Sequence, residues 1–387
     1  MLTKNIDFKN FSLKKNNKKI SLLLKKLFKE DNEIIKSLKK NYKDSFSKKN
    51  ISKLKKFSEI RLIGMGGSVL GSRSIYSFLK DKIEKKFYFN DNLENLNLSN
   101  KSKKKQLNLI ISKSGNTLET ISNSNVLLND GCRSVFITEN KKSYLTDLAK
   151  KLKSEIIFHN NFIGGRYSVL SEVGMLPASL MGLNIKKFRR LNLLIKNKRF
   201  INSLIHNVSS TLYFMKIKKF NSIILNYDEN SADLFFWYQQ LIAESLGKKS
   251  KGILPVISNM PKDNHSLMQL YLDGFKNNFY TLFFVNENSS PKIKNNRLLK
   301  THFYLKDKDL NAIKRSQFFA TENIFKRKNL PFRTISPQKK NEETLGELFT
   351  FFILETILLG RALNVNPYDQ PAVELIKTET KKFLLKS

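Results

Sequence analysis

Hydroxyl residues and a glycine follow an apolar run early in the chain, in an order typical of an anion-binding loop. The run from Leu107 to Ile111 stops at Ser112, and a turn with Lys113 and Gly115 leads into helix-type sequence at Thr117. Hydroxyls donate hydrogen bonds, glycine lets the backbone approach a ligand, and the first N–H groups of a helix attract anions. The Walker lysine spacing is absent, so one phosphate on a small molecule fits better than a nucleoside triphosphate.

A second glycine-rich turn, Gly64-Met-Gly-Gly-Ser68, also joins a strand pattern to a helix pattern. It lacks the GxGxxG fingerprint, and no acidic residue ends a following strand at the right distance, so a dinucleotide is not expected. Such turns also occur in α/β proteins for packing alone. Beside the Ser112 loop, however, Gly67 and Ser68 would add backbone and hydroxyl donors to the same anion site.

A double glycine precedes an arginine in Gly164-Gly-Arg-Tyr-Ser168. The glycines leave space, and the planar guanidinium of Arg166 supplies fixed donors for an anion or for negative charge that develops on an oxygen during a reaction. The alternative is a surface turn with a solvated arginine. Context from the other motifs decides between them.

Glu244 lies near the end of a strongly apolar helix pattern, three residues before Gly247. A carboxylate held between aromatic side chains and a glycine stop suits a general base. A water-exposed glutamate in the last turn of a helix is the alternative.

His265 differs from the other three histidines because it lies in a polar loop just before a helix pattern. It is a candidate acid or base, although a single histidine is often structural. Further on, Gln370 stands in a turn with two prolines that leads into a helix with Lys377, and positions 370, 373 or 374, and 377 are expected on one helical face. No Cys/His or His/carboxylate spacing indicates a metal site.

The elements that must position these residues follow an alternating pattern of strands and helices. This alternation predicts an α/β protein with mainly parallel sheets. Strands are expected at 59–63, 87–89, 107–111, 134–137, 156–158, 222–225, 253–257, 280–285 and 332–335. Helices are expected at 69–80, 117–129, 142–151, 232–246, 265–274, 308–320, 343–363 and 372–385. The predicted organisation is an N-terminal helical arm over 1–50, a first domain over 51–190 with the phosphate-binding loops, and a second domain over 191–387.

The formal charge of +37 could indicate a nucleic-acid partner. Lysine is abundant throughout the chain, however, and no basic stripe with interleaved aromatic residues is present. We therefore expect no specific nucleic-acid binding, although the charge favours anionic substrates. A single cysteine excludes an internal disulfide and favours a reducing, cytoplasmic location. The longest apolar stretch, residues 348–360, is too short to span a membrane.

Taken in order, the motifs from about residue 60 to 380 resemble the glucose-6-phosphate isomerase (phosphoglucose isomerase) family. The segments Gly165-Arg-Tyr-Ser168 and Gln370-Pro-Ala-Val-Glu-Leu-Ile-Lys377 are the most specific parts. The resemblance implies two SIS-type α/β/α sandwich domains and a homodimer with its active site near the subunit interface. It also implies the interconversion of D-glucose 6-phosphate and D-fructose 6-phosphate through a cis-enediol, in glycolysis and gluconeogenesis. Ala372 stands where the family usually has glycine.

The resemblance also assigns roles by position. Glu244 corresponds to the base that moves a proton between C2 and C1, and Arg166 to the group that stabilises the cis-enediolate. His265, supplied by the neighbouring subunit, and Lys377 correspond to the groups that open the sugar ring. The expected substrate and phosphate contacts are Gly67, Ser68, Ser112, Lys113, Ser114, Thr117, Gly165 and Gln370. No cofactor and no metal are implied.

Two other functions remain open at this point. A bifunctional isomerase that also accepts mannose 6-phosphate would share the fold, and motifs do not reveal which epimer a pocket prefers. A non-catalytic SIS protein that senses sugar phosphates would keep the Ser112 loop but would have no reason to keep Glu244, Arg166 and Lys377 together.

Overall fold

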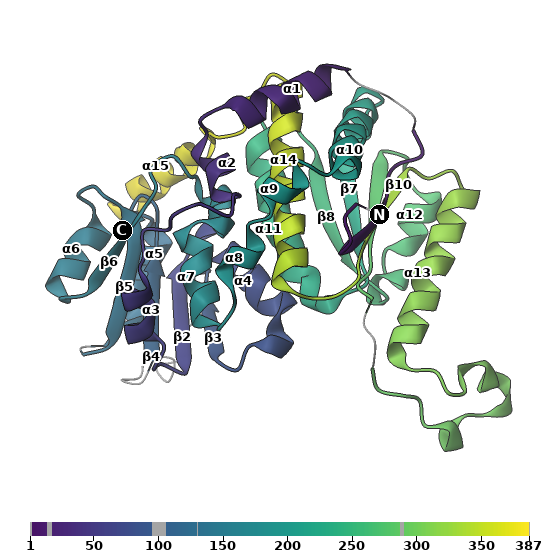
Figure 1. Ribbon diagram of the computed structural model, residues 1–387, viewed down its shortest axis with the longest axis horizontal. Coiled ribbons are helices and arrows are strands. Elements are labelled where there is room, and N and C mark those ends of the chain that lie inside the picture. Colours follow the sequence, from purple (N-terminus) through teal and green to yellow (C-terminus); the bar gives the residue numbers. More distant parts are fainter. Residues whose placement is uncertain (1, 14–17, 95–105, 130, 287–289, 387) are drawn as a thin grey trace.

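The protein is represented by a computed structural model that describes residues 2–13, 18–94, 106–129, 131–286 and 290–386. Two five-stranded sheets lie side by side, with helices around and between them (Figure 1). The first sheet has the order β3-β2-β4-β5-β6, and every neighbouring pair in it is parallel. Its strands are β2 (Glu59–Gly64), β3 (Lys86–Asn90), β4 (Gln106–Ile111), β5 (Arg133–Glu139) and β6 (Glu155–His159).

The second sheet has the order β1-β10-β9-β7-β8. Its pairs are parallel except at one edge, where β1 runs antiparallel to β10. Its strands are β1 (Ile6–Lys9), β7 (Asn221–Asn226), β8 (Leu254–Asn259), β9 (Asn278–Phe283) and β10 (Phe332–Pro337). The strands that are buried on both faces, such as β9 and β4, are made mainly of apolar residues, as parallel sheets covered by helices require.

The helices form the outer layers and also join the two sheets. Their bounds are α1 (Lys18–Lys29), α2 (Glu33–Ser37), α3 (Lys48–Leu54), α4 (Gly67–Phe78), α5 (Leu118–Leu127), α6 (Tyr144–Lys151), α7 (Glu172–Leu180), α8 (Ile185–Phe188), α9 (Leu191–Leu194), α10 (Lys198–Lys216), α11 (Ala232–Leu246), α12 (Met268–Asp273), α13 (Leu310–Arg327), α14 (Glu342–Ala362) and α15 (Val373–Leu384). Between the sheets, α4 packs on α11 and α11 packs on α14. One hydrophobic core therefore extends from the first sheet to the second.

Helix α14 shows why the core continues through the middle of the molecule. Residues 344–360 of this helix are all buried, and most of them are apolar. A mainly apolar helix that is buried on every side must be enclosed by other elements. Among the described residues, no helix is both long enough and apolar enough to cross a lipid bilayer.

The structure confirms an α/β fold with mainly parallel sheets, and it adds elements that the sequence patterns did not predict, among them strand β1 and helix α10. Strand β1 lies within residues 1–50, which were expected to be helical, and it joins the second sheet by pairing with β10. Helix α10 was also not predicted, although its Phe200, Leu204 and Val208 recur every fourth residue and are buried. The domain limits at residues 50 and 190 stay a prediction.

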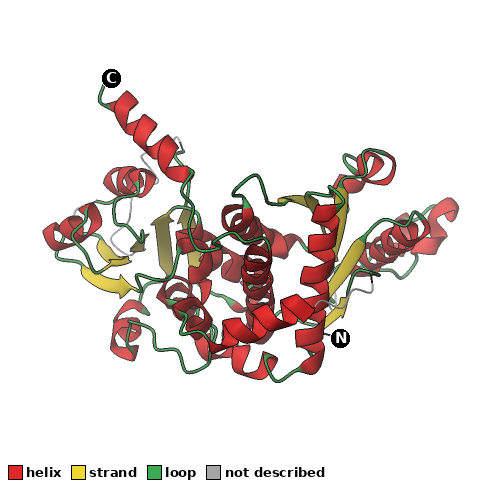
Figure 2. Cartoon of the chain, turned by 90° about the horizontal axis from the view of Figure 1, so that it is seen from above, coloured by secondary structure: helices red, strands yellow, loops and turns green. Residues whose placement is uncertain are grey.

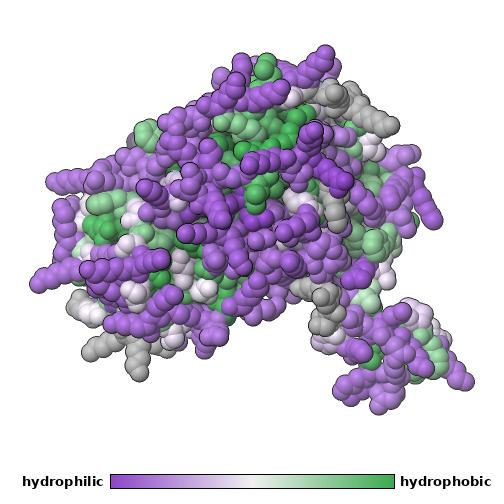
Figure 3. All heavy atoms as spheres, in the orientation of Figure 1, coloured by the Kyte–Doolittle hydropathy of each residue, from purple (hydrophilic) through white to green (hydrophobic). Residues whose placement is uncertain are grey.

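Helix α15 differs from the other long helices because none of its residues is buried. It projects from the body of the molecule at the C-terminal end (Figure 2). Leu375, Ile376 and Phe383 expose 71%, 73% and 70% of their surface. On the face shown in Figure 3, hydrophilic side chains are spread over most of the surface and not gathered in one stripe.

Candidate active site

The turn after β2 and the loop after β4 lie together because these two strands are parallel neighbours. Gly64, the last residue of β2, pairs in register with Ile111, the last residue of β4. A Cβ on Gly64 would lie only 2.7 Å from the carbonyl oxygen of Ile111. Ligands of open α/β sheets bind at this carboxyl edge. The two segments predicted to bind an anion therefore begin side by side.

Ser112 shapes the loop after β4 from the inside. Its side chain is buried, and its hydroxyl lies 2.8 Å from the Thr117 hydroxyl and accepts the Gly115 N–H at 3.2 Å. Gly115 has φ +68°, and a Cβ there would lie 2.1 Å from Oγ of Ser143. No side chain caps the first turn of α5, which starts directly after Thr117. The loop thus leads to uncapped helix N–H groups, which attract anions.

Helix α15 lies near this loop, and the two segments share a pocket of about 420 Å³. Ser114 and Thr117 line it from the loop side, and Lys377 lines it from the helix side. The ammonium of Lys377 is 2.5 Å from Glu374 on the same helix, and both side chains are exposed. Lys113 does not line this pocket, and its ammonium is 3.5 Å from the carboxylate of Glu139.

Two glycine turns touch where α4 begins. A Cβ on Gly67 would lie 2.1 Å from the carbonyl carbon of Gly165 and 2.5 Å from the backbone nitrogen of Arg166. Only a glycine at position 67 permits this approach of two backbones. The contact brings the Ser68 turn of the first sheet against the start of the 3₁₀ helix η3 (Gly165–Leu170), which carries Arg166.

Replacing Gly67 by alanine is expected to lower activity by at least about 10-fold, because displacing an active-site group by 1 Å has a large effect on rate. The matched control is Gly164→Ala, since a Cβ on Gly164 meets no atom within 4 Å. We expect Gly164→Ala to retain wild-type kcat and thermal stability. Steady-state kinetics and thermal unfolding of both variants check this prediction, and equal activity in both would contradict it.

Arg166 is buried and uses all of its N–H groups. Nε donates to Ser245 Oγ at 2.9 Å, and Nη2 donates to the carbonyl oxygens of Pro367 at 2.8 Å and Asp369 at 3.0 Å. Nη1 donates to Glu244 Oε2 at 3.0 Å and to the side-chain oxygen of Gln370. One guanidinium thus joins η3, the end of α11 and the turn before α15.

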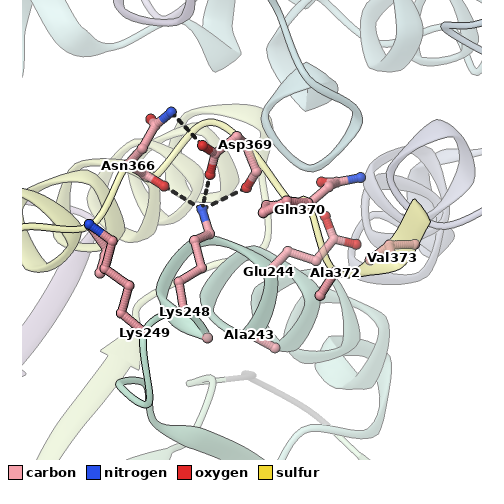
Figure 4. Close-up of a pocket in the computed structure, with 12 residues that line it drawn as sticks. Ala243, Glu244, Lys248, Lys249, Asn366, Asp369, Gln370, Ala372 and Val373 are labelled. Carbon is pink, nitrogen blue, oxygen red and sulfur yellow. Dashed lines mark hydrogen bonds and ion pairs between the residues drawn. The ribbon is translucent and has the colours of Figure 1, made fainter. Parts of the chain in front are cut away.

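Glu244 lines a pocket of about 600 Å³ together with Gln370 (Figure 4). Its side chain is 25% exposed. Each of its carboxylate oxygens accepts one hydrogen bond, Oε2 from Arg166 at 3.0 Å and Oε1 from Gln240 at 2.8 Å. A carboxylate has about four acceptor positions. These two bonds therefore fix its plane and leave lone pairs available to receive a proton.

Gln240 is a further residue of the site, and the sequence motifs did not predict it. It lies one helical turn before Glu244 on α11, and a Cβ on Gly66 would lie 2.7 Å from its side-chain nitrogen. It therefore connects the carboxylate to the Gly66 turn at the start of α4. The i to i+4 spacing from a candidate base was the available signal, because such residues share a helix face.

A buried pair, His159 and Glu172, links the two ends of the segment that carries Arg166. His159, at the end of β6, has Nδ1 2.5 Å from Glu172 Oε1 and Nε2 2.9 Å from the Ile163 carbonyl oxygen. Burial alone would raise the pKa of Glu172, but the hydrogen bonds and electrostatic attraction from His159 and the hydrogen bond from the Asn160 N–H hold that pKa below its usual value. Both ends of the segment from β6 to α7 are therefore joined.

Tyr167 adds a neutral donor next to Arg166. Burial raises the pKa of Tyr167 to about 12, so its hydroxyl stays protonated near neutral pH. That hydroxyl donates to the Pro367 carbonyl oxygen at 3.0 Å. The turn before α15 is therefore held by two consecutive residues of η3.

The structure brings Arg166, Glu244 and Gln370 together but does not bring His265 to them. His265 is exposed between the 3₁₀ helix η5 (Lys262–Asn264) and α12, and it lines neither of the two pockets described above. In Figure 1, α12 lies beside the second sheet, and α15 lies near the first sheet. A single chain therefore does not place this histidine near Glu244.

The expectation that Gln370 and Lys377 share one helical face was wrong. Helix α15 begins only at Val373, so Gln370 lies in the turn before it. The side chain of Gln370 contacts Arg166, while Lys377 lines the other pocket beside Thr117. Ala372 has φ −65°, a helical value that alanine adopts without strain, which explains why glycine is not needed there.

Within the described ranges, no group of three or more His, Cys, Asp or Glu side chains could hold a metal ion. The fold and the two pockets define a SIS-type α/β protein in which the loop predicted to bind an anion lines one pocket and the Glu244–Arg166 pair lies at the other.

Comparison with known proteins identifies the family. A model of the phosphoglucose isomerase family matches residues 16–259. The chain is 33% identical to the probable glucose-6-phosphate isomerase of Methanococcus maripaludis, over 83% of this chain and 77% of the relative. It is 32% identical to the glucose-6-phosphate isomerase of Methanocaldococcus jannaschii, over 86% of each chain. The protein therefore belongs to the phosphoglucose isomerase family.

Solved structures agree on the fold. A hypothetical protein of Thermus thermophilus superposes with a TM-score of 0.82 at 23% identity, over 95% of this chain and 94% of the other. The glucose-6-phosphate isomerase of Chlamydia trachomatis superposes with a TM-score of 0.67 at 18% identity, over 91% of this chain and 78% of the other. At these identities the likeness supports the shared architecture.

Proposed function

We propose that this protein interconverts D-glucose 6-phosphate and D-fructose 6-phosphate by moving one proton between C2 and C1 of the open-chain sugar. The observation that carries the proposal is the Glu244 carboxylate, held by Arg166 and Gln240 at the edge of a pocket, in a chain of the phosphoglucose isomerase family. The chain is an aldose–ketose isomerase, which acts on a sugar phosphate. A protein that only sensed the phosphate would not need this carboxylate.

In the proposed reaction, Glu244 accepts the proton from C2 of the aldose, and a cis-enediolate forms. The same carboxylic acid then returns the proton to C1, while the hydroxyl proton moves between O2 and O1. Substrate and product contain the same atoms and electrons, so the step needs no external oxidant or reductant. Enolate oxygens gain negative charge during this step, and a fixed cation beside them lowers the barrier. Arg166 is the proposed cation, since its Nη1 faces Glu244 and Gln370.

The substrate phosphate is proposed to bind the loop after β4. Ser114 and Thr117 line its pocket, and Ser112 keeps the loop in shape. The remaining proposed contacts to the sugar phosphate are Gly67, Ser68, Lys113, Gly165 and Gln370. Lys377 reaches the pocket from α15, where it is proposed to assist in opening the sugar ring. The phosphate lies at a distance from the reacting carbons. Binding it orients C1 and C2 of the sugar and leaves them accessible for the proton transfer.

A homodimer is proposed to complete the site with His265 of the partner subunit. Two observations support it. His265 lines neither pocket of its own chain, and the apolar side chains of α15 are exposed. A two-fold dimer would place an equivalent histidine near each partner's pocket.

Mixing two inactive variants, His265→Ala and Glu244→Gln, and allowing the subunits to exchange tests this arrangement. Mixed dimers would contain one site with both residues intact, which should restore about a quarter of wild-type activity if each site draws on two subunits. Failure to recover activity despite confirmed subunit exchange would exclude a shared site.

The proposed place of action is glycolysis and gluconeogenesis in the cytoplasm. The single cysteine is consistent with a reducing compartment.

A coupled assay of the purified chain tests the proposed function. We expect production of fructose 6-phosphate from glucose 6-phosphate, and the reverse reaction, without added metal ion or nicotinamide cofactor in the isomerase step. The same assay with mannose 6-phosphate determines whether the pocket also accepts this epimer. A folded preparation without turnover of either aldose would refute the proposal.

A further inference from the structure

Lys248 uses its whole ammonium group to hold one short turn, residues 366–370. It lies two residues after the end of α11, and its side chain is 11% exposed. Its Nζ donates to the carbonyl oxygens of Asn366 and Asp369, the latter at 2.6 Å, and to Asp369 Oδ1 at 2.7 Å (Figure 4). A lysine has three N–H donors, so these three bonds leave none for a ligand.

The carboxylate of Asp369 completes this tether. Its Oδ2 accepts a hydrogen bond from the Asn366 side-chain nitrogen at 2.9 Å, which closes the turn on itself. The hydrogen bond from Lys248 holds the pKa of Asp369 below its usual value, so the side chain is ionised near neutral pH. Lys248 therefore binds a turn that the hydrogen bond between the Asn366 and Asp369 side chains already closes.

Arg166 holds the same turn from the other side. The carbonyl oxygen of Asp369 accepts from both cations, 2.6 Å from Lys248 Nζ and 3.0 Å from Arg166 Nη2. Arg166 also binds the carbonyl oxygen of Pro367 and the side chain of Gln370. The placement of Gln370 beside Glu244 thus depends on a turn clamped between an arginine of η3 and a lysine that follows α11.

The same turn also determines where α15 starts. Only Pro371 and Ala372 separate Gln370 from the first residue of α15, and no residue of that helix is buried. With so little packing of its own, α15 depends on its attachment point for its position over the phosphate-binding loop. Lys377 lies one turn into this helix and reaches the pocket lined by Ser114 and Thr117.

We infer that Lys248 is a positioning residue for the isomerase reaction. It fixes the 366–370 turn so that Gln370 meets Arg166 and Lys377 stays above the phosphate-binding loop. This inference rests on the proposed function, because it assigns the turn a role in the same site. Lys248 acts through the turn and does not touch the reacting carbons.

Lys248→Met tests this role, because methionine keeps most of the apolar stem and removes the ammonium. Lys249→Met is the matched control. Lys249 is the next residue and lines the same pocket, but it is exposed, and no hydrogen bond or ion pair of its side chain is found among the described residues. Both variants change the net charge equally. We expect kcat of Lys248→Met to fall by about 10- to 100-fold, because the misplaced groups act on the chemical step.

Competitive inhibition by inorganic phosphate separates positioning from loss of the binding loop. The inhibition constant of phosphate should change less than about 3-fold in Lys248→Met, since Ser112 and Thr117 hold their loop without the 366–370 turn. Lys249→Met should match the wild type in kcat and in this constant. Asp369→Asn, which keeps the two carbonyl contacts of Lys248, should show a smaller loss of kcat and keeps the test valid if Lys248→Met folds poorly.

Limited trypsin digestion gives a readout independent of catalysis. The lysines of α15 should be cleaved faster in Lys248→Met than in Lys249→Met, while the rest of the chain resists equally in both. Wild-type kcat in Lys248→Met, or equal cleavage rates of α15 in the two variants, would overturn the inference. A wild-type protein without isomerase activity would refute the proposed function, and the digestion would then still report whether Lys248 holds the turn.

Discussion

Replacing Glu244 by glutamine is expected to lower kcat by about 10³- to 10⁴-fold, the contribution typical of a positioned general base. Glutamine has nearly the same shape and can still accept a hydrogen bond from Arg166, but its amide cannot take a proton from carbon at neutral pH. KM for glucose 6-phosphate should change little, because the proposed phosphate contacts lie on another loop. Steady-state kinetics and substrate-binding calorimetry measure the two effects separately.

Glu229→Gln is the control for the change in charge. Glu229 lies on the short 3₁₀ helix before α11, and its side chain is exposed to solvent. We expect this variant to behave like the wild type in both measurements. A kcat for Glu244→Gln within about 5-fold of the wild type would remove Glu244 from the role of base, since losing such a group costs at least about 10²-fold.

Arg166→Lys is expected to lower kcat by about 10²- to 10³-fold, because the fixed positive charge beside the developing oxyanion would be displaced. Lysine keeps the charge but has three donors in place of five, so it cannot reach all the partners of this guanidinium. Carbonyl oxygens of the 366–370 turn would lose partners, and the free energy of unfolding should fall by about 2 kcal/mol or more.

Arg333→Lys separates catalysis from stability. Arg333 is equally buried and binds Glu355 at 2.7 Å in the core of the second sheet, where it lines neither described pocket. It should lose a similar amount of stability but keep most of the wild-type kcat at low temperature. If both variants lost kcat equally, Arg166 would have no special part in the reaction.

The alternating patterns predicted nine of the strands to within two residues at each end, because buried parallel strands are made of continuous apolar runs. Strand β1 was not predicted because Ile6–Lys9 is short, and it becomes a strand only by pairing with β10, more than 300 residues along the chain. Such long-range pairing leaves no local signal. Helix α10 had a local signal in its buried apolar residues, but it was not recognised among abundant lysine and asparagine.

The candidate site was predictable where a motif is local. The Ser112 loop lies at a strand end, and Glu244 lies near the end of a helix, as expected. The clamp formed by Lys248 was not predictable, because its partners lie about 120 residues further along the chain. The same holds for the contact between Gly67 and Gly165, which depends on two turns meeting in space. Local patterns thus indicate which residues can act, and long-range contacts determine how they are held.

Proton exchange with solvent tests the central claim most directly. The protein would be incubated with glucose 6-phosphate in D₂O, and deuterium at C2 of glucose 6-phosphate and C1 of fructose 6-phosphate would be followed by NMR. A proton carried on Glu244 can exchange with solvent before it returns to carbon, so deuterium should accumulate at both positions over repeated turnovers. Glu244→Gln should abolish this incorporation. Continued isomerisation without any deuterium on carbon would contradict a transfer through the carboxylate and would favour a direct hydride shift between C2 and C1.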